Sequence, residues 1–150
     1  MAKKKEINID LGYKVSKINT TKFSFKDLDE DNVNQLFENE DNLSVDLGVG
    51  LGVIAEKNEI FFEINTSLTN KKTKENIIQH TGKTTFSIQN LESTYRKESD
   101  NFDIPDGLIV QLYALSFSHS RALLAVELNR TVFKDKFHLP VVDPTNILKK

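Results

Sequence analysis

Apolar and polar residues alternate along much of the first two thirds of the chain. In 43–53 (LSVDLGVGLGV), every odd position is aliphatic and every even position is polar or glycine. This period of two predicts a strand with one buried face. After a polar turn over 56–59, a second strand is predicted to pair back as a hairpin. Its apolar face carries Ile60, Phe62, Ile64 and Leu68, and its polar face carries Glu63, Asn65 and Ser67.

Two further segments have the same pattern. Residues 14–26 supply a first strand with Phe23 and Phe25 in phase, and 83–89 repeat the alternation more briefly. Because each of the four strands has one polar face, we expect an antiparallel sheet. One side of this sheet lies on the core, and the other faces water or a partner.

The last third of the chain changes to helical spacing. From Pro105, a residue that a first helical turn tolerates, apolar residues recur at steps of three, four or seven. This predicts one long helix that ends near Asn129. Its apolar coverage is wide, which favours burial on two sides, by its own sheet and by another subunit. The candidate interface residues are Leu112, Leu115, Ala122 and Val126.

Beyond the helix, Pro140 and Pro144 mark an extended tail, 139–144, before a short turn over 145–150. The fold class that follows is α+β: a four-stranded antiparallel sheet, then a long C-terminal helix and a proline-containing tail with a short helix. No repeat or linker divides the 150 residues, so we predict a single domain, 1–150.

Composition narrows the possible functions. The net charge of −2 gives no basic field for nucleic acid, and the absence of cysteine excludes disulfides and thiol nucleophiles. No secretory signal or run of 18 apolar residues is seen, so we expect a cytoplasmic protein without membrane insertion. Phenylalanine occurs ten times and tryptophan never, so the aromatic side chains either fill the core or line an apolar binding surface.

An acidic segment is the one candidate metal site. Asp27, Asp29, Asp31 and Glu38 stand at positions 1, 3, 5 and 12 of a calcium-binding EF-hand loop. Position six is Asn32 rather than glycine, and a strand precedes the segment where a helix is usual. An acidic, solvated loop is the favoured interpretation, and a calcium site is the alternative.

Other motifs do not support catalysis. Gly82-Lys83-Thr84 resembles the end of a phosphate-binding loop, but position 77 is Ile and the triplet leads into a strand. His80, His119 and His138 are spread over a turn, a helix and a tail, and His119 is expected to be a hydrogen-bonded structural residue. We therefore expect no enzyme, no cofactor and no metal.

The ordered elements resemble the SecB export-chaperone family. The first strand, with its basic-Ile start and Ser-Phe end, is similar to that of the family, and the segment 33–37 is similar to its first crossover loop. The leucine-proline tail matches as well. The resemblance extends over nearly the whole chain and rests on Lys17–Phe25, Val33–Phe37, Leu43–Leu47, Thr85–Ile88, Ser120–Leu124 and Phe137–Pro144.

This resemblance implies a chaperone that assembles as a dimer of dimers, a homotetramer. It would capture unfolded, extended polypeptides in apolar grooves. The implied groove residues are Phe23, Phe25, Leu36, Phe37, Val141 and Val142. Ordinary core packing is the alternative for the three phenylalanines.

The chain also departs from the family pattern. Members that bind the preprotein translocation motor are typically more acidic and end in an acidic tail, whereas this sequence ends Ile147-Leu148-Lys149-Lys150. This departure counts against the motor, which stays one candidate partner, and a role beside a toxin–antitoxin pair is the other candidate. A structural or ligand-binding oligomeric module with the same fold is the alternative function.

Overall fold

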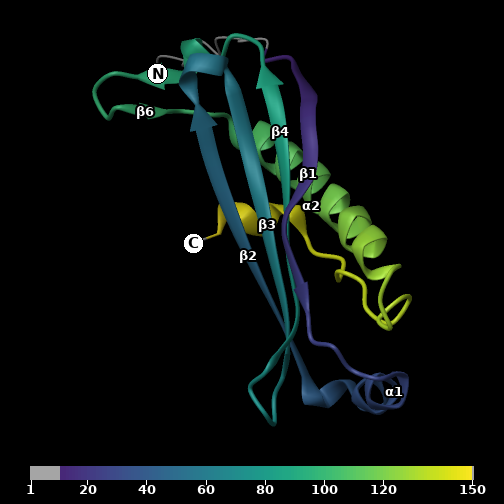
Figure 1. Cartoon of the computed structure of the whole chain (residues 1–150). Helices are drawn as coiled ribbons and strands as arrows, with labels where there is room; N and C mark the ends of the chain where they lie inside the picture. The colour runs from purple at the N-terminus through teal and green to yellow at the C-terminus, as the bar shows by residue number, and fades with distance from the viewer. Residues whose placement is uncertain (1–10, 150) are drawn as a thin grey trace.

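The computed structural model describes residues 11–149 (Figure 1). Its main elements are β1 (Tyr13–Phe25), α1 (Glu30–Glu38), β2 (Leu43–Ile54), β3 (Glu59–Asn70), β4 (Asn76–Ile88), β5 (Tyr95–Arg96), β6 (Asn101–Phe102) and α2 (Asp106–Leu128). Short 3-10 helices are η1 (Glu40–Asn42), η2 (Ala55–Lys57), η3 (Leu91–Thr94) and η4 (Pro144–Leu148). The predicted α+β class is confirmed.

Four long strands form one antiparallel sheet in the order β1-β4-β3-β2. The hairpin β2–β3 turns through η2 and Asn58, whose φ of 54° is the left-handed conformation that asparagine tolerates. β1 crosses over to pair with β4, so β1 and β2 are the two edges. The strand predicted over 83–89 is longer than expected, because β4 begins at Asn76.

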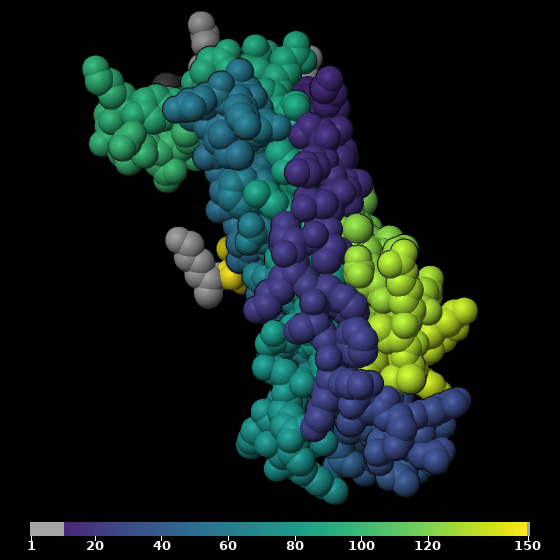
Figure 2. Space-filling model, in the orientation of Figure 1, coloured from purple at the N-terminus to yellow at the C-terminus, as the bar shows by residue number. Residues whose placement is uncertain are grey.

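One face of the sheet carries the core, and α2 packs on it, against β4, β3 and β1 (Figure 1). Directly paired residues of antiparallel strands share a face. The pairs Ile60–Phe86 and Leu68–Ile78 place their side chains on the core face of the sheet, where all four are at most 1% exposed. The opposite face is polar, and Figure 2 shows it as a surface formed by the strands themselves. The predicted apolar and polar faces of β3 are confirmed.

Helix α2 follows the prediction closely. It runs over Asp106–Leu128, with Pro105 as its N-cap and Asn129 as its C-cap. One predicted interface residue is wrong: Leu112 is fully buried against the protomer's own core, so no second subunit can contact it. At 100° per residue, Leu112 lies roughly 40–80° from the other three predicted residues, at the edge of the sheet-facing arc.

The acidic segment forms helix α1 and is not a loop. Asp29 is the N-cap, and its side chain accepts a hydrogen bond of 2.8 Å from the backbone N–H of Asn32. Val33, Leu36 and Phe37 then face inward at helical spacing. Because the segment is helical from Glu30 to Glu38, its carboxylates do not form the loop of an EF-hand. Among residues 11–149, no group of three or more His, Asp or Glu side chains is placed to hold a metal ion.

Two smaller features complete the chain. The hairpin β5–β6 projects beyond the β2 edge, and η4 packs against α2 (Figure 1). Within the part of the chain that the structure describes, no helix is long and apolar enough to cross a membrane.

Candidate functional site

An exposed row of aliphatic side chains runs along edge strand β2. The row consists of Val45, Leu47, Val49 and Leu51, whose exposed fractions lie between 37% and 45%. Their direct partners on β3, from Leu68 to Phe62, are buried, so the row is on the same face as the core. The sequence prediction that this face of β2 is buried is therefore wrong, because α2 covers β1, β3 and β4 but leaves β2 uncovered.

A cavity of about 440 Å³ lies at the start of this row. It is bordered by the end of α1, the beginning of β2 and the tail that follows α2. The lining residues are Phe37, Glu40, Leu43, Val45, Leu68, Lys136, Phe137, His138 and Pro140. We call this cavity and the adjoining row on β2 the groove. Val45 belongs to both, so the apolar surface continues from one into the other.

Aromatic rings build the wall behind the groove. Phe37 packs edge-on against Phe133 at 6.3 Å between ring centroids, and Phe25 packs against the same ring at 6.2 Å. Phe23 joins the cluster through Phe25, at 5.6 Å. Three phenylalanines predicted for the groove thus meet around Phe133, a fully buried residue that the sequence reasoning missed. Its position after the helix, in a polar stretch, gave no periodic signal.

The groove residues predicted from the sequence do not all gather at one place. Phe37 lines the cavity, and Phe25 is 42% exposed beside it in the aromatic cluster. Val141 and Val142 line a separate hollow of about 140 Å³ between the tail and α2. The residues Val45, Leu47, Val49 and Leu51 were missed as site residues because alternation marks a one-sided strand whether or not anything covers it.

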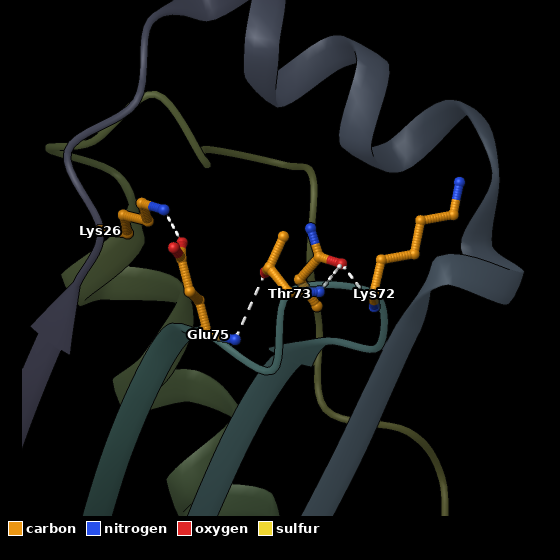
Figure 3. A network of polar contacts seen from close by, with 5 residues as sticks. Lys26, Lys72, Thr73 and Glu75 are labelled. Atoms are coloured by element: carbon orange, nitrogen blue, oxygen red, sulfur yellow. Dashed lines mark hydrogen bonds and ion pairs between the residues drawn. The ribbon is translucent and has the colours of Figure 1, made fainter.

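Leu36 borders a third, polar pocket at the β3–β4 turn, away from the groove cavity. Figure 3 shows the contacts that shape this turn. Lys26, directly after β1, forms an ion pair with Glu75, and the backbone N–H of Glu75 donates to the Thr73 hydroxyl at 3.4 Å. The backbone N–H of Lys72 donates to the side-chain oxygen of Asn70 at 2.9 Å. These contacts fix a turn, and we assign Leu36 to this pocket.

Two histidines lie where α2 meets the sheet. His80 on β4 is 1% exposed, with its Nε2 2.9 Å from the Thr20 hydroxyl, and burial lowers its pKa from 6.5 to about 4. His119 on α2 contacts the Thr84 hydroxyl through Nδ1 at 3.1 Å, and burial lowers its pKa as well. Both are held as neutral groups, and the predicted structural role of His119 agrees with this contact.

Among known proteins, solved structures are similar to this chain. No protein-family model matches the sequence, and no curated protein matches it. The chain is similar to a SecB-like chaperone of Mycobacterium tuberculosis in complex with a ChAD peptide from the HigA1 antitoxin. The TM-score is 0.48 at 11% sequence identity, over 87% of this chain and 89% of that chain.

Proposed function

We propose that this protein is a chaperone that holds unfolded, extended polypeptides in the groove along β2. The observation that carries the proposal is the uncovered row of Val45, Leu47, Val49 and Leu51, which continues into the cavity at Phe37. Soluble proteins seldom leave such a row exposed unless a partner covers it. The sequence resemblance to SecB-like chaperones supports the same function.

The shape of the site favours an extended ligand over a compact one. As an edge strand, β2 leaves one side of its backbone without a neighbouring strand among the described residues. An extended polypeptide can lie along this edge and place alternate side chains against the aliphatic row. Aliphatic and phenylalanine side chains bind apolar groups without demanding one sequence, which suits a variety of unfolded clients.

Assembly and location extend the proposal. The sequence resemblance supports a homotetramer that works in the cytoplasm. Its clients would be preproteins awaiting export or a partner in a toxin–antitoxin pair, and the translocation motor remains a candidate partner. None of these steps requires catalysis or a cofactor.

A charge placed in the row tests the proposal. Val49→Asp should weaken the capture of an unfolded client roughly tenfold, because the apolar contact of one valine is lost. The measurement is light scattering of an aggregating client at increasing chaperone concentration. Val132→Asp is the matched control, since Val132 is equally exposed, at 40% against 41%, but lies outside the groove. Failure of the unmodified protein to suppress aggregation at stoichiometric excess would refute the proposal.

A structural assembly subunit is the second candidate function. It is favoured by a small apolar patch on α2, where Ala122 is exposed and Val126 is 61% exposed. A dye that fluoresces on apolar surfaces separates the two functions. After assembly, a chaperone keeps its groove exposed and binds the dye, whereas a structural oligomer has buried its apolar surface.

A further inference from the structure

The tail segment 137–142 separates two hollows of the molecule, and we call it the strap. On one side, Phe137, His138 and Pro140 line the groove cavity of about 440 Å³. On the other side, Val141 and Val142 line the hollow of about 140 Å³ beside α2. Residues that the sequence placed in one groove therefore lie on both sides of the strap.

A single side chain of α2 bonds the backbone of the strap. The Nε of Arg121 donates to the carbonyl oxygen of Leu139 at 3.3 Å, and its Nη2 donates to that of Pro140 at 3.2 Å. Among residues 11–149, no other hydrogen bond reaches the strap. The guanidinium also lies over the buried ring of Phe117, 5.4 Å from its centroid, which fixes the direction of its N–H groups.

The rest of the strap is held by apolar side chains, among them Val142, which is partly buried against the core. Phe137 and Leu139 point into the core and are 9% and 3% exposed, whereas Val141 is 90% exposed. Pro140 has no N–H to donate, so the strap cannot add a regular hydrogen-bonding strand at this point. The two bonds from Arg121 are therefore the polar contacts that fix its backbone at the groove.

We propose that Arg121 is a latch that positions the strap as one wall of the groove, and that its release joins the two hollows into one longer groove. The proposal rests on the proposed function of the groove and adds its regulation. A guanidinium can donate to two neighbouring carbonyls at once, and an ammonium group does not reproduce this geometry. Arg121→Lys therefore keeps the charge and the helix propensity but loses the paired bonds.

Thiol labelling tests the latch without any client. The chain has no cysteine, so an introduced cysteine is the only thiol. Leu43→Cys places it in the groove cavity behind the strap, and Val53→Cys places it on the same strand and the same face, outside the cavity. Both native side chains are partly buried. The labelling rate by a small maleimide is measured for each, with Arg121 intact and with Arg121→Lys.

Loss of the latch should raise the labelling rate at position 43 on the order of tenfold, because two charge-assisted hydrogen bonds no longer hold the strap. The rate at position 53 should not change. An unchanged rate at position 43 overturns the proposal. An equal rise at both positions also overturns it, because it indicates loosening of the whole fold.

A client-binding measurement separates this proposal from the proposed function. The association rate of a reduced, carboxymethylated client protein should rise with Arg121→Lys in step with labelling at position 43. If labelling rises but no variant binds the client, the latch stands and the chaperone function fails. If the unmodified protein binds the client and labelling does not respond, the latch fails and the function stands.

Discussion

At the scale of single residues, His80 couples the stability of the fold to pH. Its ring is buried on the α2-facing side of the sheet, against Phe23 and the Thr20 hydroxyl. No described carboxylate forms a salt bridge with it that would favour the charged form. Protonation of His80 in the folded protein therefore places an uncompensated charge in the core.

The sign of this effect follows from the pKa, which burial lowers from 6.5 to about 4. Between these values the unfolded chain binds the proton and the folded chain does not. Above pH 6.5, His80 is neutral in both the folded and the unfolded chain, and the free energy of unfolding is at its full value. As the pH falls toward 4, the unfolded chain alone binds the proton, and the free energy of unfolding decreases. From about pH 7.5 to about pH 5 we expect a loss of about 2 kcal/mol from this residue.

Urea unfolding at the two pH values checks this prediction. His80→Gln should remove about 2 kcal/mol of the difference in unfolding free energy between them. His138→Gln is the control, because His138 is exposed, and it should leave the difference as it is. An unchanged pH dependence in His80→Gln would contradict the assignment of the buried neutral form.

At the scale of elements, the local sequence pattern predicts whether a segment is a strand or a helix. Which of its faces is covered depends on how distant segments pack against it. The alternation in 43–53 gave β2 correctly, but its exposure depends on where α2 crosses the sheet, which is a long-range property. The segment of helix α1 was predicted as an acidic, solvated crossover loop. Asp29 as N-cap and apolar residues at 33, 36 and 37 were a helix signal that could have been recognised.

The site was predicted in part for the same reason. Phe25 and Phe37 do lie together, but the ring that joins them, Phe133, comes from the turn after α2. Val141 and Val142 were assigned to the groove by family resemblance, but they line the hollow beside α2, and Arg121 bonds the two backbone carbonyls that precede them. No periodic pattern in the sequence indicates such contacts between distant segments.

The contact of α2 with β4 depends on a glycine. A methyl group at Gly82 would collide with the Ser120 hydroxyl and lie 3.0 Å from the Ser120 Cβ. Gly82→Ala should therefore push the helix from the sheet and lower the free energy of unfolding by about 1–3 kcal/mol. Gly48→Ala is the control, because the nearest atom would be 3.6 Å away, an ordinary contact. Chemical denaturation of both variants gives the comparison, and equal stability would show that α2 adjusts at no cost.

At the scale of the whole molecule, three groups of exposed apolar side chains bear on binding and assembly. One is the β2 row, the second is the β1 edge with Val15, Ile18 and Phe25, and the third is a patch on α2. The patch consists of Ala122 and Val126, which lie one helical turn apart, whereas Leu108 and Leu115 are partly buried against the core. The groove and the patch lie on different elements, so the proposed client binding and assembly can be separated by mutation.

Val126→Asp tests assembly through α2. Light scattering of the unmodified protein should give a species larger than the 17.1 kDa chain. The variant should give a smaller species, because a carboxylate buried in an apolar interface costs several kcal/mol, roughly a hundredfold or more in dissociation constant. Val132→Asp again serves as the control, since Val132 is an exposed valine outside α2. If Val126→Asp leaves the mass unchanged while Val49→Asp lowers it, the β2 row joins the subunits and is not a free groove for clients. A smaller species that still suppresses aggregation would instead place the client site on the single chain, with α2 serving assembly alone.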